Sequence, residues 1–479
     1  MRLERLIAEA GLRDEGVLIR VIGEQATEVT AVTMDSRSVG PGAMFACVPG
    51  RVSDGHDFAP TAVADGAAGL LCERPLDLDV PQVVVSSVRL ALGPVCDAFF
   101  GHPSRDLTVA AVTGTNGKTT TCAFLSAIFE ANGWQSATIG TLTQRRTTPE
   151  APELQALMSD WRALGGRAIA MEVSSHALHQ HRTDATKFAA GVFTNLTTDH
   201  LDYHRTMEDY FEAKSRLFEP GRVAVAVVNR GDPWGQKLID RLGKSDSTLE
   251  TFATDDAVDL RMEPGRSTFR WDGRNMAINL GGSFNVENAL AAATCARALG
   301  VDAETVVEGL SSVSAVRGRF ELVQAGQSFT VVVDFAHTPD GLTQVLRAAR
   351  GFGDGRLIVV FGAGGDRDHE KRPLMGAVAS ELADLAVVTS DNPRSEDPGV
   401  IIEQVVAGAA GRAKMIVEAD RTSAIAAALA VAQRGDVVVI AGKGHEQGQE
   451  AGGRTVPFDD VEVARDALLR IQASRQVLE

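Results

Sequence analysis

The sequence predicts an α/β protein with three domains, and three observations support that prediction. A chain of 479 residues corresponds to about three domains of ordinary size. Apolar residues make up 44% of the chain, which is enough for several packed cores without disulfides or structural metals. After the first hundred residues, short apolar runs rich in β-branched side chains alternate with longer helical patterns, as parallel α/β sheets require.

Two local breaks in composition predict where the domains meet. The segment FFGHPSRDL at 99–107 joins Gly, Pro and Ser to charged residues just before an apolar run, and SAVRGRF at 314–320 forms a similar break. Such clusters mark turns and linkers between packed units. We therefore expect domains over residues 1–100, 101–317 and 318–479.

Charge and cysteine usage exclude several classes of protein. The chain has 47 Lys and Arg against 63 Asp and Glu, a net charge of −16, whereas general nucleic-acid binding depends on Lys and Arg. No apolar run approaches the length of a membrane span, and the first residues lack the apolar core of a signal peptide. Five widely spaced cysteines without a CxxC pair indicate reduced thiols. We expect a cytoplasmic protein that binds no nucleic acid.

Eight apolar runs are predicted as strands, at 107–114, 167–173, 189–195, 223–229, 329–335, 356–362, 385–390 and 436–442. Two alanine-rich runs, at 289–300 and 422–435, predict buried helices. Five of the strands lead directly into a polar or glycine-rich turn, at 114–118, 172–176, 334–337, 391–394 and 442–446. Because open parallel sheets bind ligands at the carboxyl ends of their strands, we expect the chemistry there, in a cleft between domains.

The segment TGTNGKTT at 113–120 lies between a predicted strand and the amphipathic helix predicted over 121–133. Its glycines let several backbone N–H groups point at one anion, and the helix N-terminus adds its dipole. Lys118 is then expected to reach the β- and γ-phosphates of a nucleotide, with the Thr119 hydroxyl on Mg²⁺. The full GxxxxGK[ST] spacing is not met, because Val112 occupies its first glycine position. A glycine turn with an incidental lysine is the alternative.

Lys214 lies in a predicted helix, MEDYFEAKSRLFEP, where all four neighbours one turn away are apolar: Tyr210, Phe211, Leu217 and Phe218. The lysine is therefore expected to point inward. Burial disfavours the ammonium form, and a neutral amine can react with CO₂ to give a carbamate, which resembles a carboxylate metal ligand. A lysine whose stem covers the core while its ammonium reaches solvent remains open.

Polar groups near that helix suggest a metal site. The run TNLTTDHLDYH carries Asp199, His200, Asp202 and His204 just beyond a predicted strand, and Glu172 ends another strand. A carboxylate and an imidazole beside a nucleotide loop suit Mg²⁺-dependent phosphoryl chemistry. A polar loop with a capping Asp is the alternative.

Eight motifs in order, spread over almost the whole chain, resemble the Mur ligase family of ATP-dependent amide ligases. They are TGTNGKTT at 113–120, TTP at 147–149, EVSSHAL at 172–178, TNLTTDHLDYH at 194–204, YFEAKSRLF at 210–218, FNVENALAA at 284–292, GRFE at 318–321 and DFAHTPD at 334–340. The resemblance implies a central P-loop-type ATPase domain with a parallel sheet and a C-terminal Rossmann-like α/β domain. It also implies a role in peptidoglycan precursor synthesis.

Three further motifs resemble the MurE type within that family. They are GAGGDRDHEKRPLMG at 362–376, DNPR at 391–394 and GKGHE at 442–446. The resemblance implies addition of meso-diaminopimelate to UDP-MurNAc-L-Ala-D-Glu through an acyl phosphate, by a monomer using ATP and Mg²⁺. Diaminopimelate carries a far carboxylate where lysine has none, and Arg394 can clamp that group, with Arg367 as a second candidate. By itself, DNPR would also suit a type I turn.

The resemblance assigns roles to individual residues. The catalytic residues are Lys118, Glu172, His200 and Lys214, with Thr119, Glu172, His200 and carbamylated Lys214 around the metals. ATP is expected at Gly114, Thr115, Asn116, Gly117, Lys118, Thr119, Thr120, Asn285, Arg319, Asp334 and His337. The UDP-sugar peptide is expected at Met34, Ser36, Thr147, Thr148, Ser174, Gln180 and Arg182. Diaminopimelate is expected at Arg367, Asp391, Asn392, Pro393, Arg394, Gly442 and Glu446.

Other functions remain as alternatives. A lysine-adding or other Mur-type ligase, or a folylpolyglutamate-type ligase, would share the ATP motifs but not DNPR. A phosphotransferase or NTPase would release ADP without forming an amide. A non-catalytic scaffold would use ATP only as a conformational ligand, which the presence of Lys118, Glu172 and Lys214 argues against.

Overall fold

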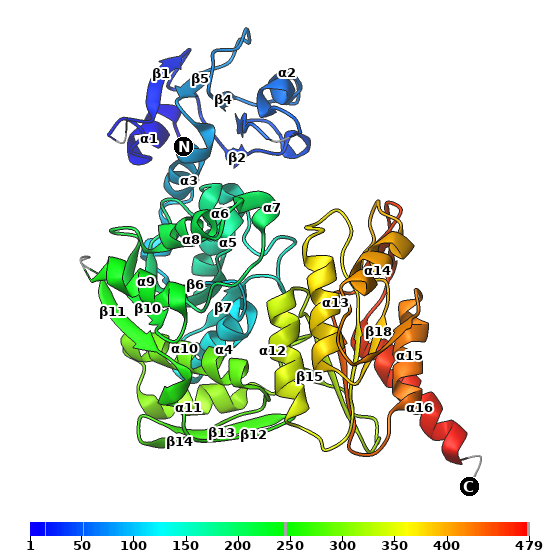
Figure 1. The fold of residues 1–479 in the computed structure, drawn as a ribbon. Coiled ribbons are helices and arrows are strands. Elements are labelled where there is room, and N and C mark those ends of the chain that lie inside the picture. Colours follow the sequence, from blue (N-terminus) through cyan, green and yellow to red (C-terminus); the bar gives the residue numbers. More distant parts are fainter. Residues whose placement is uncertain (15, 51, 244–246, 477–479) are drawn as a thin grey trace.

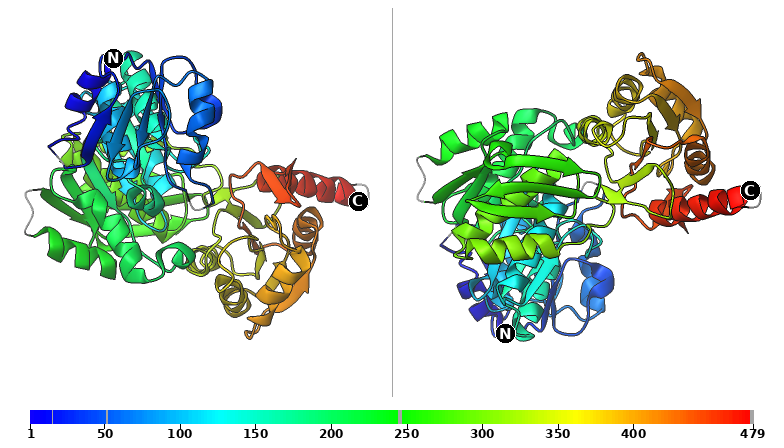
Figure 2. Two further views of the ribbon diagram at one scale, coloured as in Figure 1. Left: turned by 90° about the horizontal axis from the view of Figure 1, so that it is seen from above. Right: turned by 90° about the horizontal axis from the view of Figure 1, so that it is seen from below.

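The computed structural model describes residues 1–14, 16–50, 52–243 and 247–476. Three α/β domains make up the molecule, with the first domain stacked on one end of the central domain and the third domain beside it (Figure 1). Views from above and below keep the third domain to one side of the other two, with the C-terminal helix pointing away from them (Figure 2). The three-domain α/β prediction is confirmed. The boundaries at 100/101 and 317/318 stay a prediction.

The first domain is built on a five-stranded sheet in the order β1-β5-β4-β3-β2, with only β1 antiparallel. Its strands are β1 (Leu18–Ile22), β2 (Ala31–Thr33), β3 (Ala43–Ala46), β4 (Gly69–Cys72) and β5 (Gln82–Val85). Its helices are α1 (Leu3–Glu9), α2 (Ala59–Ala64) and α3 (Val88–Phe99), and its short 3₁₀ turns are η1 (Ser36–Ser38) and η2 (Gly55–Phe58). The turn η3 (Pro103–Arg105) follows α3 and packs against the central domain. Strands β3, β4 and β5 are wholly buried, since helices cover both faces of the sheet.

The central domain contains a six-stranded parallel sheet in the order β11-β10-β9-β6-β8-β7. Its strands are β6 (Thr108–Thr113), β7 (Ser136–Ile139), β8 (Ala168–Glu172), β9 (Phe188–Phe193), β10 (Val223–Asn229) and β11 (Thr248–Phe252). Along β6, Val109 and Ala111 pack into one core and Ala110 and Val112 into the other. Burial on both faces explains why this strand is a continuous apolar run.

Helices cover both faces of the central sheet. They are α4 (Lys118–Ala131), α5 (Ala151–Ala163), α6 (Ser175–His179), α7 (Leu201–His204), α8 (Met207–Ser215), α9 (Pro233–Leu242), α10 (Ser283–Ala298) and α11 (Ala303–Ser312), with η4 (Arg216–Phe218) and η5 (Thr254–Asp256). An antiparallel ribbon of β12 (Val258–Glu263), β13 (Arg266–Trp271) and β14 (Arg274–Ile278) adds side chains to the same core as α4, α10 and α11. The alanine-rich run at 289–300 lies in α10, which is buried as predicted.

The third domain contains a second six-stranded sheet, in the order β15-β16-β20-β17-β18-β19, in which only β15 is antiparallel. Its strands are β15 (Glu321–Leu322), β16 (Thr330–Asp334), β17 (Leu357–Phe361), β18 (Leu385–Val388), β19 (Lys414–Val417) and β20 (Val437–Ala441). Helices α12 (Pro339–Arg350), α13 (Lys371–Leu382) and α14 (Pro398–Ala407) cover one face, and α15 (Arg421–Val431) and α16 (Asp460–Gln476) the other. A hairpin of β21 (Gly448–Ala451) and β22 (Arg454–Pro457) follows β20.

All eight predicted strands are present, but no strand of the first domain was predicted, and neither were the four edge strands of the two six-stranded sheets. These edge strands, β7, β11, β15 and β19, contain few fully buried residues. A strand at the edge of a sheet is shielded on fewer sides, so it does not need the continuous apolar run by which the central strands were recognised. The second alanine-rich run lies mainly in α15, which is buried on one face only.

Candidate active site between the domains

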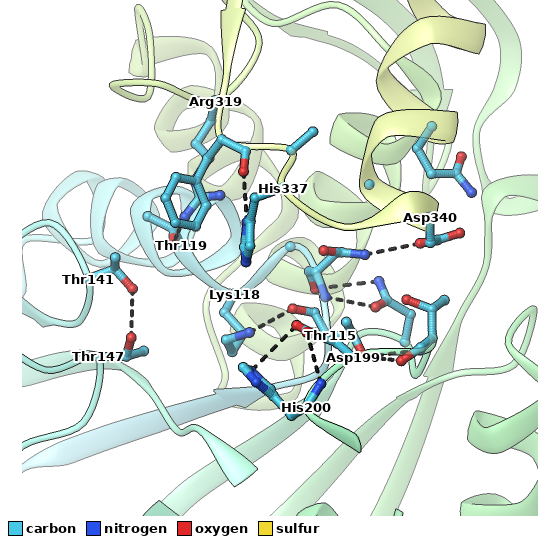
Figure 3. Close-up of a pocket in the computed structure, with 18 of the residues that line it drawn as sticks. Thr115, Lys118, Thr119, Thr141, Thr147, Asp199, His200, Arg319, His337 and Asp340 are labelled. Atoms are coloured by element: carbon cyan, nitrogen blue, oxygen red, sulfur yellow. Dashed lines mark hydrogen bonds and ion pairs between the residues drawn. The ribbon is translucent and has the colours of Figure 1, made fainter. Parts of the chain in front are cut away.

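A cavity of about 820 Å³ lies where the carboxyl ends of the central sheet face the third domain (Figure 3). The predicted residues that line it are Thr115, Asn116, Gly117, Lys118, Thr119, Thr120, Thr147, Thr148, Glu172, Ser174, Arg182, His200, Asn285, Arg319, Asp334, His337, Arg367, Asp391, Asn392, Arg394, Gly442 and Glu446. The predicted residues outside its lining are Met34, Ser36, Gly114, Gln180, Lys214 and Pro393. One cavity therefore brings together residues from the central domain and the third domain.

The glycine-rich loop runs from the end of β6 to Lys118, the first residue of α4. Gly117 has φ +87°, and a β-carbon there would collide with the Asn288 side chain, so this position requires glycine. The Lys118 ammonium donates to the carbonyl oxygens of Gly114 at 2.9 Å and Thr115 at 2.8 Å. The loop thus has the form of an anion-binding turn at a helix N-terminus.

The segment between β9 and α7 packs beneath the glycine-rich loop and forms hydrogen bonds with it. The Asn195 side-chain oxygen accepts from the backbone N–H of Asn116 at 2.9 Å, and the Thr194 hydroxyl donates to the Asn116 carbonyl at 2.6 Å. The Thr115 hydroxyl donates to the Thr197 carbonyl at 3.2 Å. These bonds hold the loop in its conformation. Asn195 and Thr197 also line the cavity, although neither was among the predicted site residues.

Glu172 ends β8 and is buried. Its two carboxylate oxygens accept from the Thr141 backbone N–H at 2.9 Å and the Thr141 hydroxyl at 3.1 Å. The His200 ring lies 3.4 Å from the Asp199 carboxylate, and both residues line the cavity (Figure 3). Desolvation lowers the pKa of His200 below its ordinary value, against the opposing effect of Asp199. The ring is therefore neutral near pH 7, the form in which imidazole binds metals.

Lys214 points inward, as predicted, and its side chain is 1% exposed. Its ammonium donates to the Gly114 carbonyl at 2.7 Å and lies 4.6 Å from the centre of the Tyr210 ring. Burial lowers the pKa of this amine well below its ordinary value. Lys214 is thus beneath the glycine-rich loop, bonded to the same carbonyl as Lys118.

The predicted sugar-peptide residues fall into two groups. Thr147, Thr148, Ser174 and Arg182 line the cavity. Gln180 lies behind them and orients Arg182, because its side-chain oxygen accepts from the Arg182 guanidinium at 2.7 and 3.2 Å. Met34 and Ser36 lie in the first domain, around the turn η1, where Met34 packs against that domain's core. A role for Met34 and Ser36 in holding a UDP group stays a prediction.

Two hydrogen bonds join the third domain to the glycine-rich loop. The Arg319 guanidinium donates to the Thr119 hydroxyl at 2.9 Å, and the Asn116 amide donates to the Asp340 carboxylate at 3.1 Å. Arg319, His337 and Asp340 thus enter the cavity from the third domain, opposite Lys118 (Figure 3). Asp340 was not among the predicted site residues, although it closes the motif DFAHTPD.

The third domain contributes a polar wall to the cavity at the ends of β18 and β20. Arg394 donates to the Gly365 carbonyl at 2.7 Å, and its Nε lies 3.3 Å from the Glu450 carboxylate. The Asn392 amide donates to the Glu446 carboxylate at 2.7 Å. Gly442 has φ +118°, and a β-carbon there would collide with the Asp391 carboxylate. Carboxylates and a guanidinium on one wall suit a ligand that carries both charges.

Four further residues were missed by the sequence analysis. Arg146 and Lys371 line the cavity, and Arg146 lies 3.3 Å from Glu150. Glu150 in turn lies 3.1 Å from Arg182. Lys443 is buried behind the polar wall. Each of these residues lies inside a recognised motif or next to one, and that position could have indicated that it belongs to the site.

Family models match three parts of the chain. Residues 28–97 match "Mur ligase family, catalytic domain", residues 112–296 match "Mur ligase middle domain", and residues 318–444 match "Mur ligase, glutamate ligase domain". The chain belongs to the Mur ligase family. As a Mur ligase, it is an ATP-dependent amide ligase.

Curated Mur ligases are similar over nearly the whole chain. A protein from Geobacillus kaustophilus is 44% identical over 92% of this chain and 95% of its own length. One from Gloeobacter violaceus is 42% identical over 98% of each chain. One from Streptomyces coelicolor is 43% identical over 93% of this chain and 94% of its own. All three are named UDP-N-acetylmuramoyl-L-alanyl-D-glutamate–2,6-diaminopimelate ligase.

Solved Mur ligase structures share the fold. A structure with the same ligase name superposes with a TM-score of 0.68 at 32% identity, covering 99% of each chain. A MurF ligase from Thermotoga maritima superposes with a TM-score of 0.64 at 21% identity, over 94% of this chain and 99% of its own. At that lower identity the likeness concerns the fold alone.

Proposed function

We propose that this Mur ligase joins meso-diaminopimelate to UDP-MurNAc-L-Ala-D-Glu, with conversion of ATP to ADP and phosphate. The observation that carries the proposal is the single cavity that brings the glycine-rich loop of the central domain to the wall containing Asn392, Arg394 and Glu446. Relatives at 42–44% identity are named for this reaction. Peptidoglycan precursor synthesis is the process served.

ATP is needed because a carboxylate is a poor electrophile. Transfer of the γ-phosphoryl group to the side-chain carboxylate of D-Glu forms an acyl phosphate and ADP. The diaminopimelate amine then attacks the acyl carbon, phosphate leaves from the tetrahedral intermediate, and the amine loses a proton as the amide forms. Lys118 and Arg319 line the cavity from the central and third domains. Both would neutralise charge on the transferring phosphoryl oxygens.

Mg²⁺ is expected beside the glycine-rich loop, where Thr119, Glu172 and His200 line one cavity. No group of three or more His, Cys, Asp or Glu side chains that could hold a metal occurs among the residues that the structure describes. Mg²⁺ does not require such a group, because it is commonly held by one or two carboxylates together with substrate phosphates and water. The hydroxyl and carboxylate oxygens therefore fit this ion. When bound, Mg²⁺ supplies positive charge to the phosphates of ATP.

Lys214 would join the metal site only as a carbamate. Its buried amine, with a lowered pKa, has the neutral form that reaction with CO₂ requires. Addition of CO₂ forms an N–C bond and releases one proton, which leaves a carboxylate-like group on Nζ. The support for this step is the burial of the side chain beneath the loop that Lys118 also contacts.

The remaining site assignments follow the cavity walls. Thr147, Thr148, Ser174 and Arg182 would hold the sugar peptide near the phosphate loop. Arg394, with Arg367, would bind the far carboxylate of diaminopimelate. We infer that the enzyme acts in the cytoplasm as a monomer. The residues that the structure describes include no helix long and apolar enough to cross a membrane.

The test is an assay that reads both ADP and product mass with UDP-MurNAc-L-Ala-D-Glu, ATP and a panel of diamino acids. ADP release that depends on meso-diaminopimelate, together with the mass of the new amide, is the expected result. Activity with lysine but none with meso-diaminopimelate would assign the chain to the lysine-adding ligases. ADP release without an amide product would instead make it an NTPase.

A further inference from the structure

Lys443 is a buried lysine between two residues of the proposed diaminopimelate site, Gly442 and Glu446. It follows β20 in a tight turn, in which the Glu446 backbone N–H donates to the Lys443 carbonyl at 3.0 Å. The glycines on either side, Gly442 and Gly444, have φ +118° and +54°. This turn directs the lysine side chain inward, where its exposed fraction is 0%.

The ammonium of Lys443 contacts two cavity residues. It donates to the Asn392 side-chain oxygen at 2.9 Å and to Oε2 of Glu446 at 3.0 Å. The Asn392 amide nitrogen donates to the same Oε2 at 2.7 Å. Ammonium, amide and carboxylate thus form a closed triangle behind the cavity wall.

This triangle determines which way each site group faces. An ammonium can only donate hydrogen bonds, so Asn392 must present its carbonyl oxygen to Lys443 and its NH₂ group to Glu446. The Glu450 backbone N–H donates to the same Asn392 oxygen at 2.9 Å. Both contacts on Glu446 are made to Oε2, which leaves Oε1 for a ligand.

The neighbouring arginine is connected to the same network. The Arg394 backbone N–H donates to the Glu450 carbonyl at 3.0 Å, and Glu450 lies in the strand β21 that also contacts Asn392. Arg394 and Glu446 therefore have a fixed relation to each other. An α-amino acid end group, which carries an ammonium and a carboxylate on one carbon, matches a carboxylate and a guanidinium held in this way.

Burial of a charged pair contributes little net stability, because removing both charges from water costs about as much as their attraction returns. Apolar side chains at both positions of the pair would stabilise the fold about as well. The benefit of a buried ammonium here therefore lies in the orientation of the groups that it contacts.

We propose that Lys443 is a positioning residue for diaminopimelate recognition. It orients Glu446 and Asn392 so that Oε1 of Glu446 receives the ammonium next to the carboxylate that Arg394 binds. This proposal rests on the proposed function and adds a residue that acts through Glu446.

Two analogues separate this role from that of Arg394. Lysine lacks the far carboxylate of diaminopimelate but keeps the far ammonium, whereas 2-aminoheptanedioate keeps the carboxylate and lacks the ammonium. In the full-length Lys443→Met enzyme, the preference in kcat/KM for diaminopimelate over 2-aminoheptanedioate should fall about tenfold. The preference for diaminopimelate over lysine and the KM for ATP should change little. Lys443→Gln, which keeps a neutral donor, should lie between Lys443→Met and the wild type.

The control is Arg356→Met, which removes an ion pair with Asp436 at the opposite, amino end of β17 and β20. It should leave both preferences and the KM for ATP unchanged. In a Glu446→Gln background, Lys443→Met should have no further effect on the preference over 2-aminoheptanedioate. Independent effects of the two substitutions would overturn the proposal.

Unchanged preferences in a folded Lys443→Met protein would also overturn it. Loss of the cooperative thermal transition in both Lys443 variants would assign the residue a structural role instead, which again overturns the proposal. Wild-type enzyme that makes no amide with diaminopimelate would contradict the proposed function itself, a separate result.

Discussion

Replacement of Arg394 by methionine tests the proposed recognition of a far carboxylate. The Arg394 side chain is 21% exposed in the cavity wall, and two of its five N–H donors face Gly365 and Glu450. The remaining donors can bind a substrate carboxylate. Hydrogen bonds to a charged group contribute about 1.5–3 kcal/mol, so the variant should lose roughly 10- to 150-fold in kcat/KM for diaminopimelate.

The assay measures ADP release and amide mass with diaminopimelate and with lysine, which offers no carboxylate to Arg394. The variant's activity with lysine should be nearly unchanged. The ratio of kcat/KM for diaminopimelate to kcat/KM for lysine therefore measures the contribution of Arg394. Methionine keeps a β-carbon, and thus the same backbone strain at the Arg394 φ of +53°. Arg356→Met is the matched control, at the amino ends of the central strands β17 and β20. An Arg394→Met enzyme that still prefers diaminopimelate by the wild-type ratio would refute the reasoning.

Three other substitutions test the loop, the buried amine and an ion pair. Gly117→Ala should weaken ATP binding at least about tenfold, because it brings strain at positive φ and a collision with Asn288; wild-type affinity by calorimetry would contradict this. Burial lowers the pKa of Lys214. Below the ordinary pKa of lysine, the unfolded state therefore binds more protons at this site than the folded state does. The free energy of unfolding consequently falls as the pH falls. Lys214→Met should therefore raise the melting temperature in CO₂-free buffer, by more at pH 6 than at pH 9, and an equal change at both would contradict it. Hydrogen bonds from Arg372 lower the pKa of Glu396 to about 2, so this carboxylate stabilises the fold above its ordinary pKa and loses that contribution as pH falls toward 2. Glu396→Gln should destabilise the protein at pH 7 and less at pH 3, which thermal unfolding at the two pH values would check.

Parts of the candidate site could be predicted where residues close together in the sequence indicate a chemical role. The glycine-rich loop is recognised from a strand, glycines and a helix that follow one another in the sequence. The inward direction of Lys214 is recognised from its apolar neighbours one helical turn away. The burial of Lys214 is confirmed. The edge strands β7, β11 and β19 were missed because partly exposed strands lack a continuous apolar run.

The contacts between motifs were not predictable in this way. Asn116 and Asp340 are 224 positions apart, and Arg319 and Thr119 are 200 apart, so no local pattern relates them. Lys443 was passed over inside a recognised motif, because its partner Asn392 precedes it by 51 positions. Such pairs depend on how domains and strands are arranged.

By itself, the sequence determined the α/β class, the glycine-rich loop and the resemblance to Mur ligases, because strand burial, loop geometry and motif order are local properties of the chain. Only the tertiary structure decided that Lys214 lies beneath the glycine-rich loop, that the Lys443 ammonium contacts Asn392 and Glu446, and that one cavity joins the two domains. These relations follow from the packing of segments far apart in the chain, and hydrogen bonding and burial act over a few ångströms, whatever the sequence separation.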